Sequence, residues 1–199
     1  YEDIAQAREK IVQLQNEEMG MPHHRAAKNF DTNIGYANWY LDNAEKYLAP
    51  EIAYEDDKEV AKIVYEPLGV IAVIVPWNFP FSNFVWGTTQ NLLVGNTIVF
   101  KHSEECPLTA RYMGEIFEKH LPDGVFNQVF GDGKVGQTLL EQNINGITFT
   151  GSTKVGKQIF ELAGKRFIKS VMELGGSAPG IVFNDADINT TITKITEAR

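Results

Sequence analysis

Asn78 and Glu173 are the two side chains whose sequence surroundings point most directly to chemistry. Asn78 follows the apolar run 70–75 and lies between Pro76 and Pro80, which restrict the backbone on both sides of it. A side-chain amide held in this way can donate a hydrogen bond to an oxygen that becomes negative during a reaction. An asparagine in an ordinary turn explains the same residues equally well, so this segment alone leaves both interpretations open.

Glu173 lies near the end of the apolar stretch 170–174 and is followed, after one leucine, by Gly175 and Gly176. Solvation at the surface explains this placement poorly, and we expect a partly buried carboxylate. Such a group can serve as a general base near neutral pH. The alternative is a glutamate at a sheet edge beside a flexible turn.

Two further segments carry groups suited to a nucleotide. Lys101 and Glu104 close the stretch 97–101, where both can hydrogen-bond ribose hydroxyls and the carboxylate would repel a 2′-phosphate. A solvated loop with a weak surface ion pair is the alternative, and these residues taken alone favour it. In 149–156, Gly151 permits close approach of a ligand, and Ser152 with the free N–H groups of a helix start can receive a phosphate.

Ser152 or Thr153 can also be a simple helix N-cap, an interpretation that is compatible with phosphate binding. Gly131 and Gly133 form a second glycine-rich turn, which by itself is a weak signal for a dinucleotide.

Alternating apolar and amphipathic segments predict the elements that position these groups. We expect strands at 70–75, 97–101, 125–130, 147–150, 170–174 and 180–183. We expect helices at 81–94, 108–119, 135–141, 153–162 and from Asp187 onward. Continuous apolar strands between helices predict an α/β fold with a doubly wound, mostly parallel Rossmann-like sheet, which binds ligands at the carboxyl ends of its strands. Two N-terminal helices, at 4–14 and 30–48, and a β-hairpin at 52–65 precede it.

Composition argues against several classes of function. The net charge of −8 and a pI near 5.0 argue against partners such as nucleic acid or an anionic membrane surface. The single cysteine, Cys106, excludes an internal disulfide and favours the cytoplasm. No apolar run approaches the ~18–20 residues of a membrane span. His23 and His24 are expected on a surface loop, and no metal site is expected.

The order of the motifs resembles that of the aldehyde dehydrogenase superfamily over nearly the whole chain. The segments are Glu18-Met19-Gly20-Met21-Pro22, Pro67-Leu68-Gly69-Val70, Pro76-Trp77-Asn78-Phe79-Pro80, Gly95-Asn96-Thr97, Lys101 with Glu104, Phe149-Thr150-Gly151-Ser152-Thr153, Glu173-Leu174-Gly175-Gly176, and Pro179 with Asp185-Ala186-Asp187. The resemblance implies oxidation of an aldehyde to the carboxylic acid with NAD or NADP as the cofactor.

The resemblance also implies a role for individual residues. Asn78 would donate to the oxyanion, and Glu173 would activate water for hydrolysis of a cysteine thioester. The implied cofactor-binding residues are Trp77, Lys101, Glu104, Gly133, Phe149, Gly151, Ser152 and Leu174. Phe84 and Trp86 would line the aldehyde tunnel. The hairpin 52–65 resembles part of an oligomerisation arm, and the family forms homodimers or tetramers.

Departures from the family pattern shape the remaining expectations. The family's nucleophilic cysteine would fall beyond Arg199, so residues 1–199 are expected to be an NAD(P)-binding fragment that lacks the catalytic-cysteine domain and is inactive alone. Cys106 has no catalytic counterpart and is expected to be a small buried or half-buried thiol. Lys101-His102 and Ser177 after Gly176 resemble the succinate-semialdehyde dehydrogenase branch. Two alternatives remain, a catalytically inactive dinucleotide-binding module and a relative that transfers the acyl group to coenzyme A.

Overall fold

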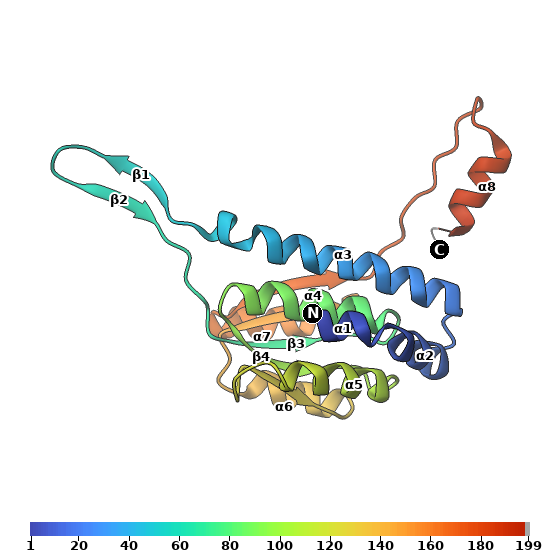
Figure 1. The fold of residues 1–199 in the computed structure, drawn as a ribbon, viewed down its shortest axis with the longest axis horizontal. Coiled ribbons are helices and arrows are strands. Elements are labelled where there is room, and N and C mark those ends of the chain that lie inside the picture. Colours follow the sequence, from blue (N-terminus) through green and yellow to red (C-terminus); the bar gives the residue numbers. More distant parts are fainter. Residues whose placement is uncertain (198–199) are drawn as a thin grey trace.

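The computed structural model describes residues 1–197 and shows a parallel sheet between two layers of helices (Figure 1). The strands are β1 (Glu51–Glu55), β2 (Val60–Ile63), β3 (Val70–Ile74), β4 (Thr97–Lys101), β5 (Phe126–Val129), β6 (Gly146–Gly151) and β7 (Lys169–Leu174). The helices are α1 (Glu2–Gln6), α2 (Arg8–Met19), α3 (His23–Leu48), α4 (Pro80–Leu93), α5 (Pro107–Glu118), α6 (Gly133–Glu141), α7 (Thr153–Arg166) and α8 (Ile188–Glu197).

The central sheet has five parallel strands in the order β5-β4-β3-β6-β7. The chain builds β3, β4 and β5 toward one edge, then returns through α6 to place β6 on the other side of β3. The strand order therefore reverses between β3 and β6, the place where doubly wound sheets bind ligands. The doubly wound parallel sheet expected from the sequence is confirmed.

Two hydrophobic cores cover the two faces of this sheet. Ile71 and Val73 of β3 pack with Phe100 of β4 against helices α2 to α5. Ala72, on the opposite face of β3, packs with residues of β6, α6 and α7. Successive side chains of a strand point to opposite faces, so a strand that is apolar throughout must be buried on both sides. The continuous apolar runs of the sequence reflect this requirement.

The N-terminal part of the chain forms α1 to α3 and then a separate hairpin. Helix α3 packs along α4, and β1 pairs with β2 in an antiparallel hairpin that stands away from the sheet (Figure 1). The hairpin expected at 52–65 is confirmed. The first expected helix is divided at Ala7, whose backbone N–H bonds to the carbonyls of both Asp3 and Ile4.

Two expectations about secondary structure are wrong. Residues 180–183 form no strand, and Ile181 and Phe183 are 76% and 74% exposed, because no neighbouring strand in the described part of the chain offers backbone partners. His23 and His24 are exposed as expected, but they begin α3 directly after Pro22 instead of lying in a loop. Proline restricts the residue before it and tolerates a helix after it, so a helix can start there.

Candidate functional site

The carboxyl edge of the sheet brings together segments that are distant in the sequence. Ile74 of β3 pairs with Lys101 on one side and with Phe149 on the other. One strand further along, Thr150 pairs with Glu173. The loops after β3, β4, β6 and β7, which carry the candidate residues, therefore meet along one edge.

A cleft of about 460 Å³ opens below this edge between α6 and α7, within the size range of small-molecule sites. Its lining residues are Ile74, Lys101, Gly133, Gly136, Gln137, Leu140, Glu141, Phe149, Val155, Gln158, Ile159 and Leu162. Three of the expected cofactor residues, Lys101, Gly133 and Phe149, are thus brought into one cavity. Trp77, Glu104, Gly151, Ser152 and Leu174 lie outside this lining.

Lys101 is buried at the end of β4, and only 5% of its surface is exposed. Its Nζ lies 3.1 Å from Glu104 Oε2, while the Glu104 side chain is half exposed. A hydrogen bond from its own backbone N–H lowers the pKa of Glu104 below the ordinary value, and Lys101 adds to this effect. The pair therefore presents a buried cation and an ionised carboxylate, in place of the solvated surface pair that the sequence alone favoured.

The start of α7 has the geometry of a capped helix. Ser152 is the N-cap, and its Oγ accepts a hydrogen bond from the Val155 backbone N–H at 3.3 Å. A Cβ added at Gly151 would lie 2.6 Å from the Phe149 ring, so any larger residue at this position would require the ring to move. At the start of α6, Asp132 caps the helix through the Lys134 N–H at 2.9 Å, one residue before Gly133. Because α6 follows β5 and α7 follows β6, both helices begin at the carboxyl edge of the sheet, and the positive ends of their dipoles lie there.

The loop after β3 exposes its central side chains. Asn78 is exposed, and its side chain has no hydrogen-bond partner among the described residues. Trp77 is 51% exposed, whereas Pro80 is buried as the first residue of α4. A hydrogen bond of 3.3 Å from Asn83 Nδ2 to the Pro76 carbonyl closes the loop from within. The Asn78 amide is thus available to an incoming group.

Glu173 is exposed, so the expectation of a partly buried carboxylate is wrong for the described part of the chain. Its strand, β7, is the last of the sheet. Met172 packs into the core beneath α7, which directs its neighbour Glu173 to the opposite face. Nothing in the described chain covers that face at β7, and Val171 beside it is 53% exposed.

Phe84 occupies the core and not a substrate path. It is 0% exposed, and its ring packs against Phe100, Phe117 and Phe126 at centroid distances of 5.4, 4.9 and 5.8 Å. The expected tunnel role of Phe84 is therefore corrected to a packing role. Trp86 is 46% exposed on α4, and its tunnel role remains a prediction.

Cys106 is a buried thiol, as expected, and 0% of its surface is exposed. Burial, with the nearby charges of Glu18 and Glu105, raises the pKa of Cys106 to about 12. The nucleophile in thiol chemistry is the thiolate, which this environment disfavours. Its Sγ lies 3.3 Å from Nδ1 of His102, whose Nε2 is 3.4 Å from the Pro80 carbonyl.

His102 should make the stability of the fold dependent on pH. Burial lowers its pKa to about 4 from 6.5, and the charge of Lys101 acts in the same direction. The unfolded chain therefore binds the extra proton first as the pH falls, and the free energy of unfolding should drop by about 3 kcal/mol between pH 6.5 and 4. In urea titrations across this range, His102→Gln should show a smaller pH dependence than the unmodified chain. His23→Gln, at an exposed position, should not, and equal slopes for His102→Gln and the unmodified chain would refute the assignment.

Most of the residues that line the cleft were not predicted from the sequence. Leu140 and Gln137 of α6, and Val155, Ile159 and Leu162 of α7, recur at helical spacing on the faces that meet. Apolar residues three or four apart indicate a buried helix face but do not say whether a second helix or a cavity lies opposite. Within residues 1–197, no group of three or more His, Cys, Asp or Glu residues is placed to hold a metal ion. No helix in that range is long and apolar enough to cross a membrane.

Comparison with known proteins extends this picture. Residues 1–199 match the family described as the aldehyde dehydrogenase family. The chain is 41% identical over 182 residues to the NADP/NAD-dependent aldehyde dehydrogenase PuuC of Escherichia coli, which covers 89% of this chain and 37% of that protein. It is 34% identical to a probable succinate-semialdehyde dehydrogenase [NADP(+)] of Synechocystis, with coverage of 98% and 43%.

The fold matches that of a solved relative. The crystal structure of betaine aldehyde dehydrogenase from Staphylococcus aureus in complex with NAD+ superposes with a TM-score of 0.91 at 29% identity. The match covers 96% of this chain and 39% of that protein. The chain thus spans about two fifths of the length of the relatives it matches.

Proposed function

The chain belongs to the aldehyde dehydrogenase family, and from this premise we propose that it is the cofactor-binding part of an enzyme that oxidises an aldehyde to the carboxylic acid with NAD(P)+. Residues 1–199 supply the dinucleotide site and two catalytic side chains. We propose that the nucleophilic cysteine belongs to the part of the relatives' length that this chain does not span. The 199-residue chain alone then binds cofactor without turning over aldehyde.

The cleft between α6 and α7 is the observation that carries this proposal. The buried side chain of Lys101 lines a cavity whose walls are mostly apolar, among them Leu140, Ile159 and Leu162. Apolar walls suit a flat aromatic base, and a fixed cation in the lining suits the oxygens of an attached sugar. The residues present therefore fit an adenine dinucleotide.

We assign the parts of the cofactor by the chemistry of their neighbours. Lys101 and Glu104 hold the adenosine ribose, and the Glu104 carboxylate favours NAD over NADP because it repels a 2′-phosphate. Ser152 and the N-terminus of α7 receive the pyrophosphate. Gly133 and Phe149 line the cleft itself, and we assign Trp77, Gly151 and Leu174 to parts of the cofactor that extend beyond it.

The catalytic roles follow from where the reacting groups must lie. Bound NAD(P)+ would supply the acceptor for the hydride that leaves the carbon of the aldehyde group. Asn78 donates its amide hydrogen to the oxygen that becomes negative when a thiolate adds to the carbonyl. Glu173 takes a proton from the water that hydrolyses the resulting thioester. Cys106 is not the nucleophile, because its thiol is buried and its raised pKa keeps it protonated.

Cofactor binding by the 199-residue chain tests this assignment. NAD+ should bind in a calorimetric titration, and Lys101→Met should weaken binding by about 10- to 100-fold, because it removes a charge-assisted hydrogen bond but keeps the apolar stem. Lys165→Met, on the exposed surface of α7, is the matched control and should leave the dissociation constant unchanged. NADP+ should bind more weakly than NAD+. Equal binding by the Lys101→Met and unmodified chains would contradict the proposed site.

We propose a semialdehyde such as succinate semialdehyde as the substrate. His102 and Ser177 support this choice by their resemblance to that branch, as does the 34% identity to the probable succinate-semialdehyde dehydrogenase. The complete enzyme should have a higher kcat/KM for succinate semialdehyde than for aliphatic or hydroxy-aldehydes. The reverse order in a steady-state comparison would exclude this substrate and leave the family assignment intact.

The exposed hairpin supports a role in assembly. Ile52, Ile63 and Val64 are 60%, 49% and 58% exposed on β1, on β2 and just beyond it. Exposed apolar side chains on a projecting hairpin are characteristic of surfaces that a partner covers. We propose that this arm joins subunits of a homodimer or tetramer.

A further inference from the structure

The first turn of α4, which begins two residues after Asn78, is held by groups from three other segments. Gln15 of α2 accepts a hydrogen bond from the Phe81 backbone N–H at 3.4 Å through its Oε1. His102, after β4, places its Nε2 3.4 Å from the Pro80 carbonyl. The third segment is α3, which contacts Ser82.

Ser82 is the centre of this arrangement. Its Oγ accepts hydrogen bonds from Asn29 Nδ2 at 2.7 Å and from Asn33 Nδ2 at 2.9 Å. Asn33 and Ser82 are 4% and 2% exposed, and Gln15 is fully buried. We call Gln15, Asn29, Asn33 and Ser82 the amide cluster.

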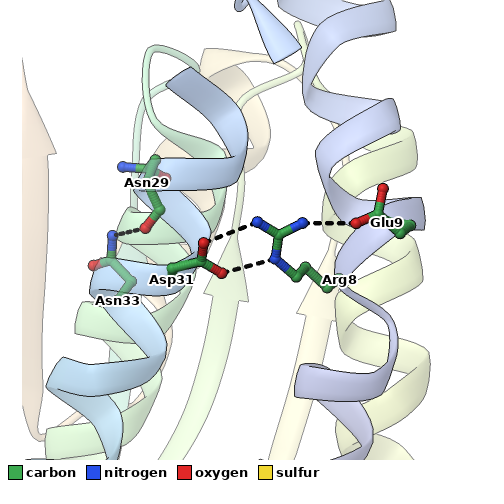
Figure 2. Close-up of polar contacts among 5 residues, drawn as sticks. All are labelled: Arg8, Glu9, Asn29, Asp31 and Asn33. Carbon is green, nitrogen blue, oxygen red and sulfur yellow. Dashed lines mark hydrogen bonds and ion pairs between the residues drawn. The ribbon is translucent and has the colours of Figure 1, made fainter. Parts of the chain in front are cut away.

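Helix α3 is also linked to α2 by an ion pair. Figure 2 shows Asn29 and Asn33 one turn apart, with Asn33 Nδ2 bonded to the Asn29 carbonyl at 2.8 Å. It also shows the Arg8 guanidinium of α2 between the carboxylates of Asp31 and Glu9, with Nε and Nη2 bonded to Asp31 at 2.7 and 2.8 Å. The Arg8–Asp31 ion pair therefore links α2 to α3, whereas the Asn33 hydrogen bond lies within α3.

Buried polar groups at a helix interface need a reason. Burying side-chain amides costs free energy that apolar residues of similar volume would not cost, so the amide cluster is not the most stabilising way to pack α3 on α4. Hydrogen bonds are directional, whereas apolar contacts tolerate sliding of one helix along the other. The amide cluster therefore fixes where along α3 the first turn of α4 lies, and with it the loop Pro76–Pro80.

We propose that the amide cluster is a positioning device for Asn78, which holds the exposed amide where the oxyanion forms. This inference rests on the proposed oxyanion role of Asn78. An exposed side chain with no partner of its own among the described residues can be oriented only through its backbone. The contacts on Pro80, Phe81 and Ser82 restrain that backbone from the helix side.

A double-mutant cycle in the complete enzyme tests the proposal. Ser82→Ala should lower kcat about tenfold when the rate is divided by the concentration of sites that bind cofactor, and the KM for NAD+ should not change. In the Asn78→Ala background, Ser82→Ala should cause no further loss, because the group that it positions is gone. Independent, multiplying losses would overturn the proposal, as would an unchanged kcat for Ser82→Ala.

Matched variants separate positioning from stability. Thr88→Val removes another buried hydroxyl of α4, one that bonds to the Phe84 carbonyl at 2.7 Å, and should lower the melting temperature without lowering kcat. A fall in kcat for Thr88→Val equal to that for Ser82→Ala would point to general loosening and overturn the proposal. If Ser82→Ala does not fold, Asn33→Ala, which leaves the Asn29 bond to Ser82, should give the same non-additive result.

The outcomes also distinguish this inference from the proposed function. Loss of activity in Asn78→Ala, with additive or absent effects of Ser82→Ala, defeats the positioning role alone. An unchanged kcat in Asn78→Ala defeats the oxyanion role, and the positioning role with it.

Discussion

Asn78→Ala in the complete enzyme should lower kcat by about 10²- to 10³-fold, the usual consequence of removing one donor to an oxyanion. The amide contributes mainly when the carbonyl oxygen becomes negative, so the loss should appear in kcat more than in the KM for the aldehyde. The Kd for NAD+ should not change, because Asn78 lies outside the lining of the cleft between α6 and α7. Steady-state kinetics together with a cofactor titration measure all three quantities.

Because Asn78 is exposed, the effect of its removal on catalysis can be separated from any effect on stability. The side chain is exposed and makes no hydrogen bond within the described chain, so its removal should leave the melting temperature unchanged. Asn143→Ala is the matched control, since Asn143 is also exposed but precedes β6 at the amino edge of the sheet. A fall of less than about threefold in kcat for Asn78→Ala would remove the oxyanion role, given the size expected for such a donor.

The sheet was predictable because burial on both faces leaves a strong trace in the sequence. Residues 70–75 and 98–100 are all apolar, and β3 and β4 agree with the strands expected at 70–75 and 97–101 to within one residue. The stretch 180–183 has the same composition yet forms no strand. A strand requires a neighbouring backbone as well as apolar side chains, and sequence composition reports only the second condition.

The sequence indicated which loops form the candidate site, but it did not indicate which of their side chains are buried. Lys101 was expected at a strand end, but its 5% exposure depends on how α6 and α7 close over the sheet. Phe84 shows the opposite error, because a motif position suggested a substrate contact and the packing of three other aromatic rings made it core. Burial is set by contacts between segments distant in sequence, which local sequence patterns do not specify.

The amide cluster was missed for a related reason. Gln15 and Asn29 each lie one residue outside the helices expected at 4–14 and 30–48, Asn33 lies within the second, and no role was expected for any of the three. They become recognisable as a unit only when α2, α3 and the start of α4 are brought together. Polar residues that interrupt an apolar helix face are the signal that would have found them.

Glu173→Gln in the complete enzyme should abolish steady-state acid formation, with a loss of about 10²- to 10⁴-fold, while sparing the first half of the reaction. Glutamine has nearly the same shape but cannot take a proton from water. Rapid mixing of enzyme, aldehyde and NAD+ should then show a burst of about one reduced cofactor per site, followed by very slow turnover. Glu161→Gln, an exposed carboxylate of α7 paired with Lys165, should leave both phases unchanged.

The location of Glu173 on the sheet determines which groups can take part in the reaction with it. Thr150 pairs with Glu173 while Phe149 and Met172 face α7, so Glu173 lies on the face of the sheet that α4 also covers. The strand β7, which carries Glu173, is two strands from β3, which leads into the Asn78 loop, and this places the two strands roughly 10 Å apart. Turnover in Glu173→Gln that is restored by adding coenzyme A would show that a thiol accepts the acyl group. Turnover to acid that is unchanged in Glu173→Gln would require another base, and the described chain offers no second carboxylate on β7.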